Sequence, residues 1–287
     1  MIPSQNIVEW SQKAPWAERR QVEQDLIISR TLVEIFGDPF LELELRFRGG
    51  TALNKLHFPK PLRYSEDIDL VRTSAGAIRP ILDKLRELLE PWLGPADFKR
   101  SPVAPKLRFR VPAEDGGEHP IRLKLEINTR ERTAYDPVVM KPFSVENPWF
   151  SGASTIPTFS NEEMLATKLR ALLQRNKGRD LFDLAHGLEV FGGLDCAQVV
   201  NLFERYLADG GVQISRVQAE QRMLAKFARG NLLTDLRPLL SADSAERMTD
   251  DATSHAVRAI FERLIRRMPG KPWAKTPEAK ARLGIEW

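Results

Sequence analysis

The sequence has few of the features that support secretion, structural metal binding or membrane insertion. Cys196 is the only cysteine among 287 residues, so no intramolecular disulfide can form. The four histidines show no metal-ligand spacing and no Ser/His/Asp arrangement. Residues 1–20 are polar and contain Trp10 and Trp16 instead of an apolar signal core, and no apolar run approaches membrane-spanning length. These absences predict a cytoplasmic protein without a membrane anchor.

The composition predicts a globular protein with an uneven distribution of basic residues. Apolar residues make up 42% of the chain, which is enough for one large domain or two modest ones. The net charge is only +4, but residues 258–282 carry eight Lys or Arg residues, namely Arg258, Arg263, Arg266, Arg267, Lys271, Lys275, Lys280 and Arg282. This segment suits a phosphate-rich partner, and it equally fits a solvated helix face followed by a frayed tail.

Changes in periodicity divide the chain into two parts. The first part mixes helical spacing with the alternation of strands. Helices are predicted at residues 18–36, 51–56 and 77–93, and strands at 43–48, 67–72, 106–111, 121–128 and within 138–145. The Gly116-Gly117 turn predicts an antiparallel hairpin between the strands at 106–111 and 121–128.

The second part has helical spacing throughout. Helices are predicted at residues 161–174, 179–190, 196–208, 216–229 and 243–268. The sequence therefore predicts an α+β/α protein, with a mixed β-sheet and flanking helices over residues 1–155 and an all-α helical bundle over residues 156–287.

Two carboxylates lie two residues apart on a predicted strand. Because strand side chains alternate, Asp67 and Asp69 project from one face while Ile68 and Leu70 face the core. Adjacent like charges are unfavourable unless a cation lies between them, and oxygen ligands favour magnesium. The pair fits a magnesium site or, taken alone, two solvated acids at the start of a strand.

Glu126 offers a third carboxylate. It lies on the polar face of the strand at 121–128. If this strand pairs beside the strand at 67–72, three acids meet on one sheet face, as two-metal phosphoryl transfer requires. Otherwise Glu126 forms a surface ion pair with Lys124 or Arg108.

A glycine turn precedes the acidic strand. The backbone amides of Gly49-Gly50-Thr51, where a strand turns into a helix, can hold phosphate oxygens, although Gly also suits an ordinary strand-helix turn. Arg63 and Ser65 flank the acidic strand, where they can contact phosphate or base or simply shape the loop.

A second group of charges lies on the predicted helices after residue 160. Lys168 should emerge at a helix edge, where it either neutralises a triphosphate or faces solvent. Asp180 and Asp183 share one edge of the next helix with Arg179, which can orient Asp183. The alternative is a surface ion pair, together with an acid at Asp180 that is favoured by the helix dipole.

The order of these features resembles a known family. Residues 47–53 (Phe-Arg-Gly-Gly-Thr-Ala-Leu) and 63–70 (Arg-Tyr-Ser-Glu-Asp-Ile-Asp-Leu) look like the signature of AbiEii/AbiGii-type, MenT-like nucleotidyltransferase toxins of the DNA polymerase β-like nucleotidyltransferase superfamily. Residues 160–184 are similar to the lysine-containing helix and Arg-Asp-x-x-Asp of that family. The chain has Gly-Gly-Thr where many superfamily members have Gly-Ser, so no serine contact to phosphate is assigned there.

The resemblance implies a catalytic domain at residues 1–155 and a helical domain at 156–287 that completes the active site. It implies two Mg²⁺ ions at Asp67, Asp69 and Glu126. It also implies a nucleoside triphosphate held at Gly49, Gly50, Thr51, Arg63, Ser65, Lys168, Arg179 and Asp180. Asp183 would orient or deprotonate the acceptor.

The implied acceptor is the 3′ end of tRNA, whose extension blocks aminoacylation, and the implied partner is a cognate antitoxin. The basic C-terminal segment would then bind the tRNA backbone. Two alternatives stay open: transfer of the nucleotide to a protein side chain, and a noncatalytic nucleotide- or RNA-binding module. The retained acids at Asp67, Asp69 and Glu126 argue against the second alternative.

Overall fold

The computed structural model describes residues 2–287, and its internal contacts divide the chain into two compact units, Met1–Ser160 and Asn161–Trp287. The boundary predicted after residue 155 falls inside a strand, β7 (Phe150–Thr158). Strand β7 was not predicted, because its sequence is rich in small residues, contains Gly152 and Pro157, and lacks the alternation typical of a half-buried strand.

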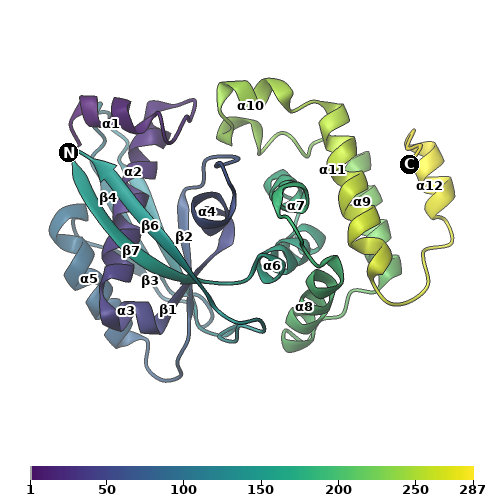
Figure 1. Ribbon diagram of the computed structural model, residues 1–287, viewed down its shortest axis with the longest axis horizontal. Helices are drawn as coiled ribbons and strands as arrows, with labels where there is room; N and C mark the ends of the chain where they lie inside the picture. The colour runs from purple at the N-terminus through teal and green to yellow at the C-terminus, as the bar shows by residue number, and fades with distance from the viewer. Residues whose placement is uncertain (1) are drawn as a thin grey trace. The chain divides into compact units, whose positions relative to one another are not determined.

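The first unit is built on a mixed sheet of seven strands in the order β3-β4-β5-β2-β1-β7-β6 (Figure 1). The strands are β1 (Leu45–Arg48), β2 (Asp67–Arg72), β3 (Asp97–Lys99), β4 (Lys106–Val111), β5 (Ile121–Asn128), β6 (Val139–Asn147) and β7. The predicted hairpin of β4 and β5 is confirmed, since these strands pair antiparallel. β2 pairs antiparallel with β1 and parallel with β5, so the acidic strand lies inside the sheet.

Helices cover the apolar face of this sheet. The long helices α2 (Arg19–Gly37) and α5 (Arg79–Leu93) pack against it, α2 on β5 and β7 and α5 on β4. Strand β5 shows the consequence, because its alternate residues are fully buried at Leu123 and Leu125 while Lys124 and Glu126 between them are partly exposed. The polar face of the sheet therefore carries the charged side chains.

The short helices around β1 differ from the sequence prediction. The strand predicted at residues 43–48 begins only at Leu45, because Pro39–Glu44 form α3. The Asp38 side chain caps α3 by accepting from the amides of Phe40 and Leu41, each at 3.0 Å. The helix predicted at 51–56 begins earlier, as α4 (Gly49–Ala52), and continues as a π-helical turn over Leu53–His57. The first unit also contains α1 (Ser4–Trp10), which was not predicted.

The elements described in the second unit are helical. The α-helices are α6 (Asn161–Gln174), α7 (Gly178–Val190), α8 (Cys196–Asp209), α9 (Arg216–Ala228), α10 (Ala242–Arg247), α11 (Asp250–Arg263) and α12 (Thr276–Arg282). The single helix predicted at 243–268 is wrong. The chain breaks at Met248, and the Thr249 side chain caps α11 by accepting from the Ala252 amide at 3.2 Å.

The C-terminal segment packs onto the second unit and is not a frayed tail. Ala279 and Ile285 join Leu224 of α9 in an apolar cluster. Lys280 is buried: its Nζ donates to the Trp287 carbonyl at 2.6 Å and lies 4.1 Å from the centre of the Trp287 ring. Part of the predicted basic segment is therefore used inside the unit.

Within residues 2–287, no helix is both long enough and apolar enough to span a membrane.

Candidate active site

The three carboxylates predicted from the sequence lie on one face of the sheet. In the register between β2 and β5, Asp69 is opposite Glu126 and Asp67 is opposite Lys124. Ile68 and Leu70 of β2 are buried in the core, and the alternation of side chains along the strand turns the aspartates to the polar face. The condition for bringing Glu126 to the aspartates is met, because its strand β5 pairs beside β2.

The carboxyl group of Asp69 lies in an environment that disfavours negative charge. Burial raises its pKa above the ordinary value, and the negative charges of Asp67 and Glu126 raise it further. A bound cation would remove this cost, because it offers the ionised carboxylate an opposite charge. The electrostatics of this face therefore favour a cation beside Asp69.

Two lysines already neutralise part of this acidic group. Lys124 Nζ lies 2.8 Å from Asp67 Oδ2 and 3.4 Å from Glu126 Oε2, and Lys106 Nζ lies 2.8 Å from Glu126 Oε2. Partial burial opposes the charge of Lys124, but the hydrogen bond that its ammonium donates to Asp67 and the nearby carboxylates raise its pKa. Glu126 thus lies opposite Asp69 and also forms the ion pair with Lys124 that was the alternative prediction.

These residues fit a divalent metal ion in their chemistry. Asp67 and Asp69 supply the hard oxygen donors that Mg²⁺ prefers, and the raised pKa of Asp69, caused by burial and by the neighbouring carboxylates, shows that its ionised form lacks a sufficient counter-charge. Across residues 2–287, no three His, Cys, Asp or Glu side chains are grouped as a metal ion would require. The assignment of Glu126 as the third metal ligand therefore stays a prediction. To bind a metal ion, its carboxylate would have to give up a contact with Lys106 or Lys124.

We expect replacement of Lys124 by methionine to increase the response of the protein to divalent cations. Without metal, the variant should lose about 1 kcal/mol of stability, because Asp67 and Glu126 lose a common cation. Added Mg²⁺ or Mn²⁺ should then raise its melting temperature more than that of the wild type. Thermal unfolding with and without each ion measures this difference.

The control for Lys124 is Lys141→Met on β6, a partly exposed lysine on a different strand. It should show the cation response of the wild type. An equal response in the Lys124 variant would contradict the idea that this lysine occupies the place of a metal ion.

The glycine turn lies directly against Asp69. Gly49 has a φ of +85°, and a Cβ added there would stand 2.2 Å from Asp69 Oδ2. Both the backbone conformation and the space require glycine. The turn therefore places backbone without a side chain next to the Asp69 carboxylate, which allows a phosphate group to approach the backbone amides closely.

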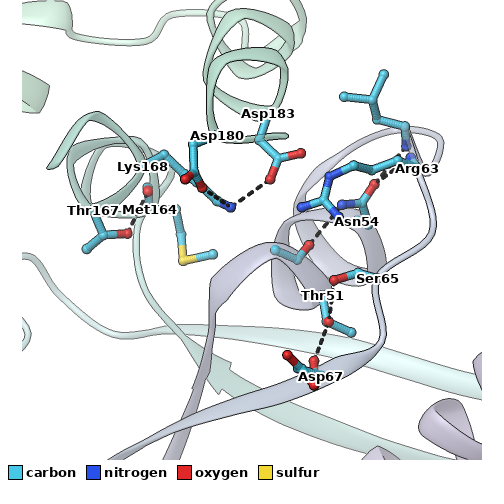
Figure 2. A network of polar contacts seen from close by, with 12 residues as sticks. Thr51, Asn54, Arg63, Ser65, Asp67, Met164, Thr167, Lys168, Asp180 and Asp183 are labelled. Atoms are coloured by element: carbon cyan, nitrogen blue, oxygen red, sulfur yellow. Dashed lines mark hydrogen bonds and ion pairs between the residues drawn. The ribbon is translucent and has the colours of Figure 1, made fainter. Parts of the chain in front are cut away.

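Hydrogen bonds fix the loop between this turn and β2. Thr51 Oγ1 lies 2.8 Å from Ser65 Oγ, and its hydroxyl donates to the Asp67 carbonyl (Figure 2). The Thr51 hydroxyl is thus occupied inside the protein, and only backbone amides of this turn are available to a phosphate. Ser65 shapes the loop, which was one of its two predicted roles.

Asn54 was missed by the sequence analysis. Its Oδ1 accepts from the amides of Leu62 and Arg63 at 2.8 and 3.1 Å, and its Nδ2 donates to the Gly50 carbonyl at 2.8 Å. Arg63 is buried and donates to the Tyr64 carbonyl at 2.9 Å. An asparagine inside a predicted helix was the available signal, since its amide competes with backbone hydrogen bonds.

The second unit holds a buried group of charges of its own. Lys168 Nζ on α6 lies 2.7 Å from Asp183 Oδ2 and 3.4 Å from Asp180 Oδ1, both on α7 (Figure 2). Arg175 binds Asp180 through two hydrogen bonds of 2.6 and 2.8 Å. Burial opposes the ionised form of Asp180, but Arg175 and Lys168 hold its pKa below the ordinary value.

These positions correct two predictions. Lys168 does not emerge at a helix edge, because its side chain is only 8% exposed. Asp183 is not part of a surface ion pair and Asp180 is not a solvated acid at the helix start, since both side chains are fully buried. Arg179 is half-buried on the same helix, and the arginine that contacts Asp180 is Arg175. Arg175 lies within residues 160–184, the stretch that resembles the family, and this was the signal for it.

The mixed sheet and the aspartate pair behind a glycine turn are those of a nucleotidyltransferase, and comparison with known proteins identifies the family. The family model described as nucleotidyl transferase AbiEii toxin, type IV toxin-antitoxin system, matches residues 30–270. The chain therefore belongs to the AbiEii nucleotidyltransferase toxin family.

Solved structures share this fold. MenT4, a nucleotidyltransferase toxin from Mycobacterium tuberculosis H37Rv, is 19% identical with a TM-score of 0.52, covering 98% of this chain and 94% of its own. JHP933 from Helicobacter pylori is 16% identical with a TM-score of 0.51, covering 94% and 98%. No curated protein matches the chain.

Proposed function

We propose that this toxin transfers a nucleoside monophosphate from a nucleoside triphosphate to the 3′ end of tRNA in a Mg²⁺-dependent reaction. The terminal hydroxyl of the tRNA attacks the α-phosphate, and pyrophosphate leaves. The added nucleotide blocks aminoacylation and translation in the cytoplasm, and a cognate antitoxin restrains the toxin. The observation that carries the proposal is the pair Asp67 and Asp69, with Gly49 against Asp69 and Glu126 opposite it.

Each group of the first unit has a defined part in this reaction. Asp67 and Asp69, with Glu126 as the proposed third ligand, would hold the metal ions. When bound, the ions supply positive charge to the phosphates and lower the pKa of the attacking hydroxyl. The backbone amides of Gly49, Gly50 and Thr51 bind phosphate oxygens. Arg63 and Ser65 hold the loop that frames the turn.

The helical second unit contributes the remaining groups in this proposal. Lys168 supplies positive charge to the triphosphate, and Asp183 orients or deprotonates the acceptor hydroxyl. Arg179 and Asp180 support nucleotide binding. Two observations support these roles. Lys168 forms ion pairs with Asp180 and Asp183, and the chain belongs to a nucleotidyltransferase family.

The proposal predicts label transfer to RNA. Purified protein is incubated with total tRNA, Mg²⁺ and each of the four α-labelled nucleoside triphosphates, and the RNA and protein are resolved on gels. We expect label in tRNA with at least one nucleotide, and none after chelation of the metal by EDTA. Label confined to protein would replace the tRNA acceptor by a protein acceptor, and no label would favour a noncatalytic binder.

A further inference from the structure

The polar face of the three strands at one end of the sheet is strongly basic. Strands β3, β4 and β5 alternate buried apolar residues, such as Leu107 and Phe109, with charged residues on the opposite face. The charged residues are Lys99, Lys106, Arg108, Arg110, Arg122 and Lys124, which we call the basic sheet face. Asp97 and Glu126 are the acids of these strands that share this face.

Like charges stand directly opposite each other across this face. Arg108 pairs in register with Lys124, and Arg110 pairs with Arg122. Such pairs destabilise a sheet, so a protein retains them at a cost unless an anion lies over them. The ion pairs of this face join Arg110 to Asp97, and Lys106 and Lys124 to the active-site acids. Among residues 2–287, no ion pair involves Arg108 or Arg122.

The basic sheet face is continuous with the candidate active site. One cross-strand row runs from Asp67 through Lys124 to Arg108, and the next runs from Asp69 through Glu126 to Lys106. At about 4.8 Å between neighbouring strands, Arg108 is only about 10 Å from the acidic strand. A polyanion lying on this face would have its end at the carboxylates.

We propose that the basic sheet face binds the phosphodiester backbone of the RNA acceptor and leads its 3′ end to Asp67 and Asp69. The inference rests on the proposed function, since it names the surface by which that reaction holds its substrate. Arg108, Arg110 and Arg122 are exposed, and each guanidinium presents the fork of donors that suits a phosphate. The basic C-terminal segment is the weaker candidate, because Lys280 is buried and Arg263 donates to the Leu188 carbonyl.

The test is tRNA binding by the full chain without nucleotide. In the triple variant Arg108→Gln, Arg110→Gln, Arg122→Gln we expect affinity at about 100 mM salt to fall about tenfold or more. The slope of log K against log salt should become shallower by up to about three, one for each lost phosphate contact. Fluorescence anisotropy over a salt series measures both quantities.

Two matched variants define the controls. Lysine at the same three positions keeps the charge and should keep affinity and slope near those of the wild type. The triple variant Arg258→Gln, Arg266→Gln, Arg267→Gln removes three exposed arginines of the C-terminal segment and should leave binding within about threefold. Loss of binding in this variant, with retention in the sheet variant, would overturn the inference.

A stability measurement separates a binding defect from a folding defect. The glutamine variant removes two cross-strand pairs of like charge and one exposed ion pair, Arg110 with Asp97, which contributes little to stability. Its melting temperature should therefore rise by about 1–4 °C. A folded variant with this rise and weak tRNA binding supports the inference. Unchanged binding overturns it.

Failure of this inference is distinguishable from failure of the proposed function. If the wild type labels no RNA but the glutamine variant still loses tRNA binding, the reaction is wrong and the surface stands. If the variant binds and labels tRNA normally, the surface is wrong and the reaction stands. If the glutamine variant labels tRNA normally but no longer binds an acidic protein that the wild type binds, the basic sheet face is a protein-binding surface and the inference is overturned.

Discussion

Replacing Asp69 by asparagine should lower the rate of nucleotidyl transfer by about a thousandfold or more while leaving the protein at least as stable as the wild type. The loss of rate follows because asparagine keeps the shape of the side chain but lacks the charge that would hold a metal ion. The gain in stability follows because the pKa of Asp69 is raised, so the folded protein holds its charged form at a cost.

The size of this stability change depends on pH. A carboxyl group with a raised folded-state pKa destabilises the protein above that pKa, and the cost disappears below the ordinary pKa of aspartate. The asparagine variant should therefore melt above the wild type near neutral pH, and the difference should shrink as the pH falls. Added Mg²⁺ should narrow the difference at neutral pH, because it stabilises only the protein that retains the carboxylate.

The measurement combines initial rates of label transfer with thermal unfolding. Asp83→Asn, at an exposed aspartate on α5 of the same unit, is the matched control and should keep full activity. A rate within tenfold of the wild type in the Asp69 variant would contradict the assignment of the active site. A melting temperature well below that of the wild type would show instead that Asp69 is structural.

Replacing Lys168 by methionine should destabilise the second unit by about 3–5 kcal/mol. The change leaves Asp180 and Asp183 buried with one cation fewer, and breaking a buried ion pair on one side costs this much. Denaturant unfolding of the full chain measures the loss. Lys177→Met, at an exposed position between α6 and α7, should change stability by less than about 0.5 kcal/mol.

A double variant separates the structural role of Lys168 from a role in the reaction. Adding Asp183→Asn to Lys168→Met removes a charge from each side of the 2.7 Å pair and should restore part of the stability. It should not restore activity if both residues also act on the substrates. A single Lys168 variant that is fully stable yet inactive would assign the lysine to the reaction alone.

The acidic strand and its neighbour were predictable because their information is local. In β2 and β5, alternation of apolar and charged residues fixes which side chains share a face, and both strands have the predicted bounds. The glycine turn was also visible in the sequence. What the sequence did not show is that Gly49 must stay bare because Asp69 Oδ2 occupies the space.

The elements that were missed depend on distant partners. β7 has a weak strand pattern and is held by pairing with β6 along its whole length. α12 lies in a segment of mixed polarity and is held by the cluster that Ala279 and Ile285 form with Leu224. Local propensity is weak in both segments, so tertiary contacts decide their structure.

The sequence by itself determined the two aspartates, their common face and the family to which the chain belongs. Only the tertiary structure decided that Glu126 stands opposite Asp69, that Lys124 lies between the acids, and that Lys168 is buried. The physical reason is that periodicity fixes the direction of a side chain within its own strand or helix. The order of strands and the burial of a charge depend on contacts between residues far apart in the chain.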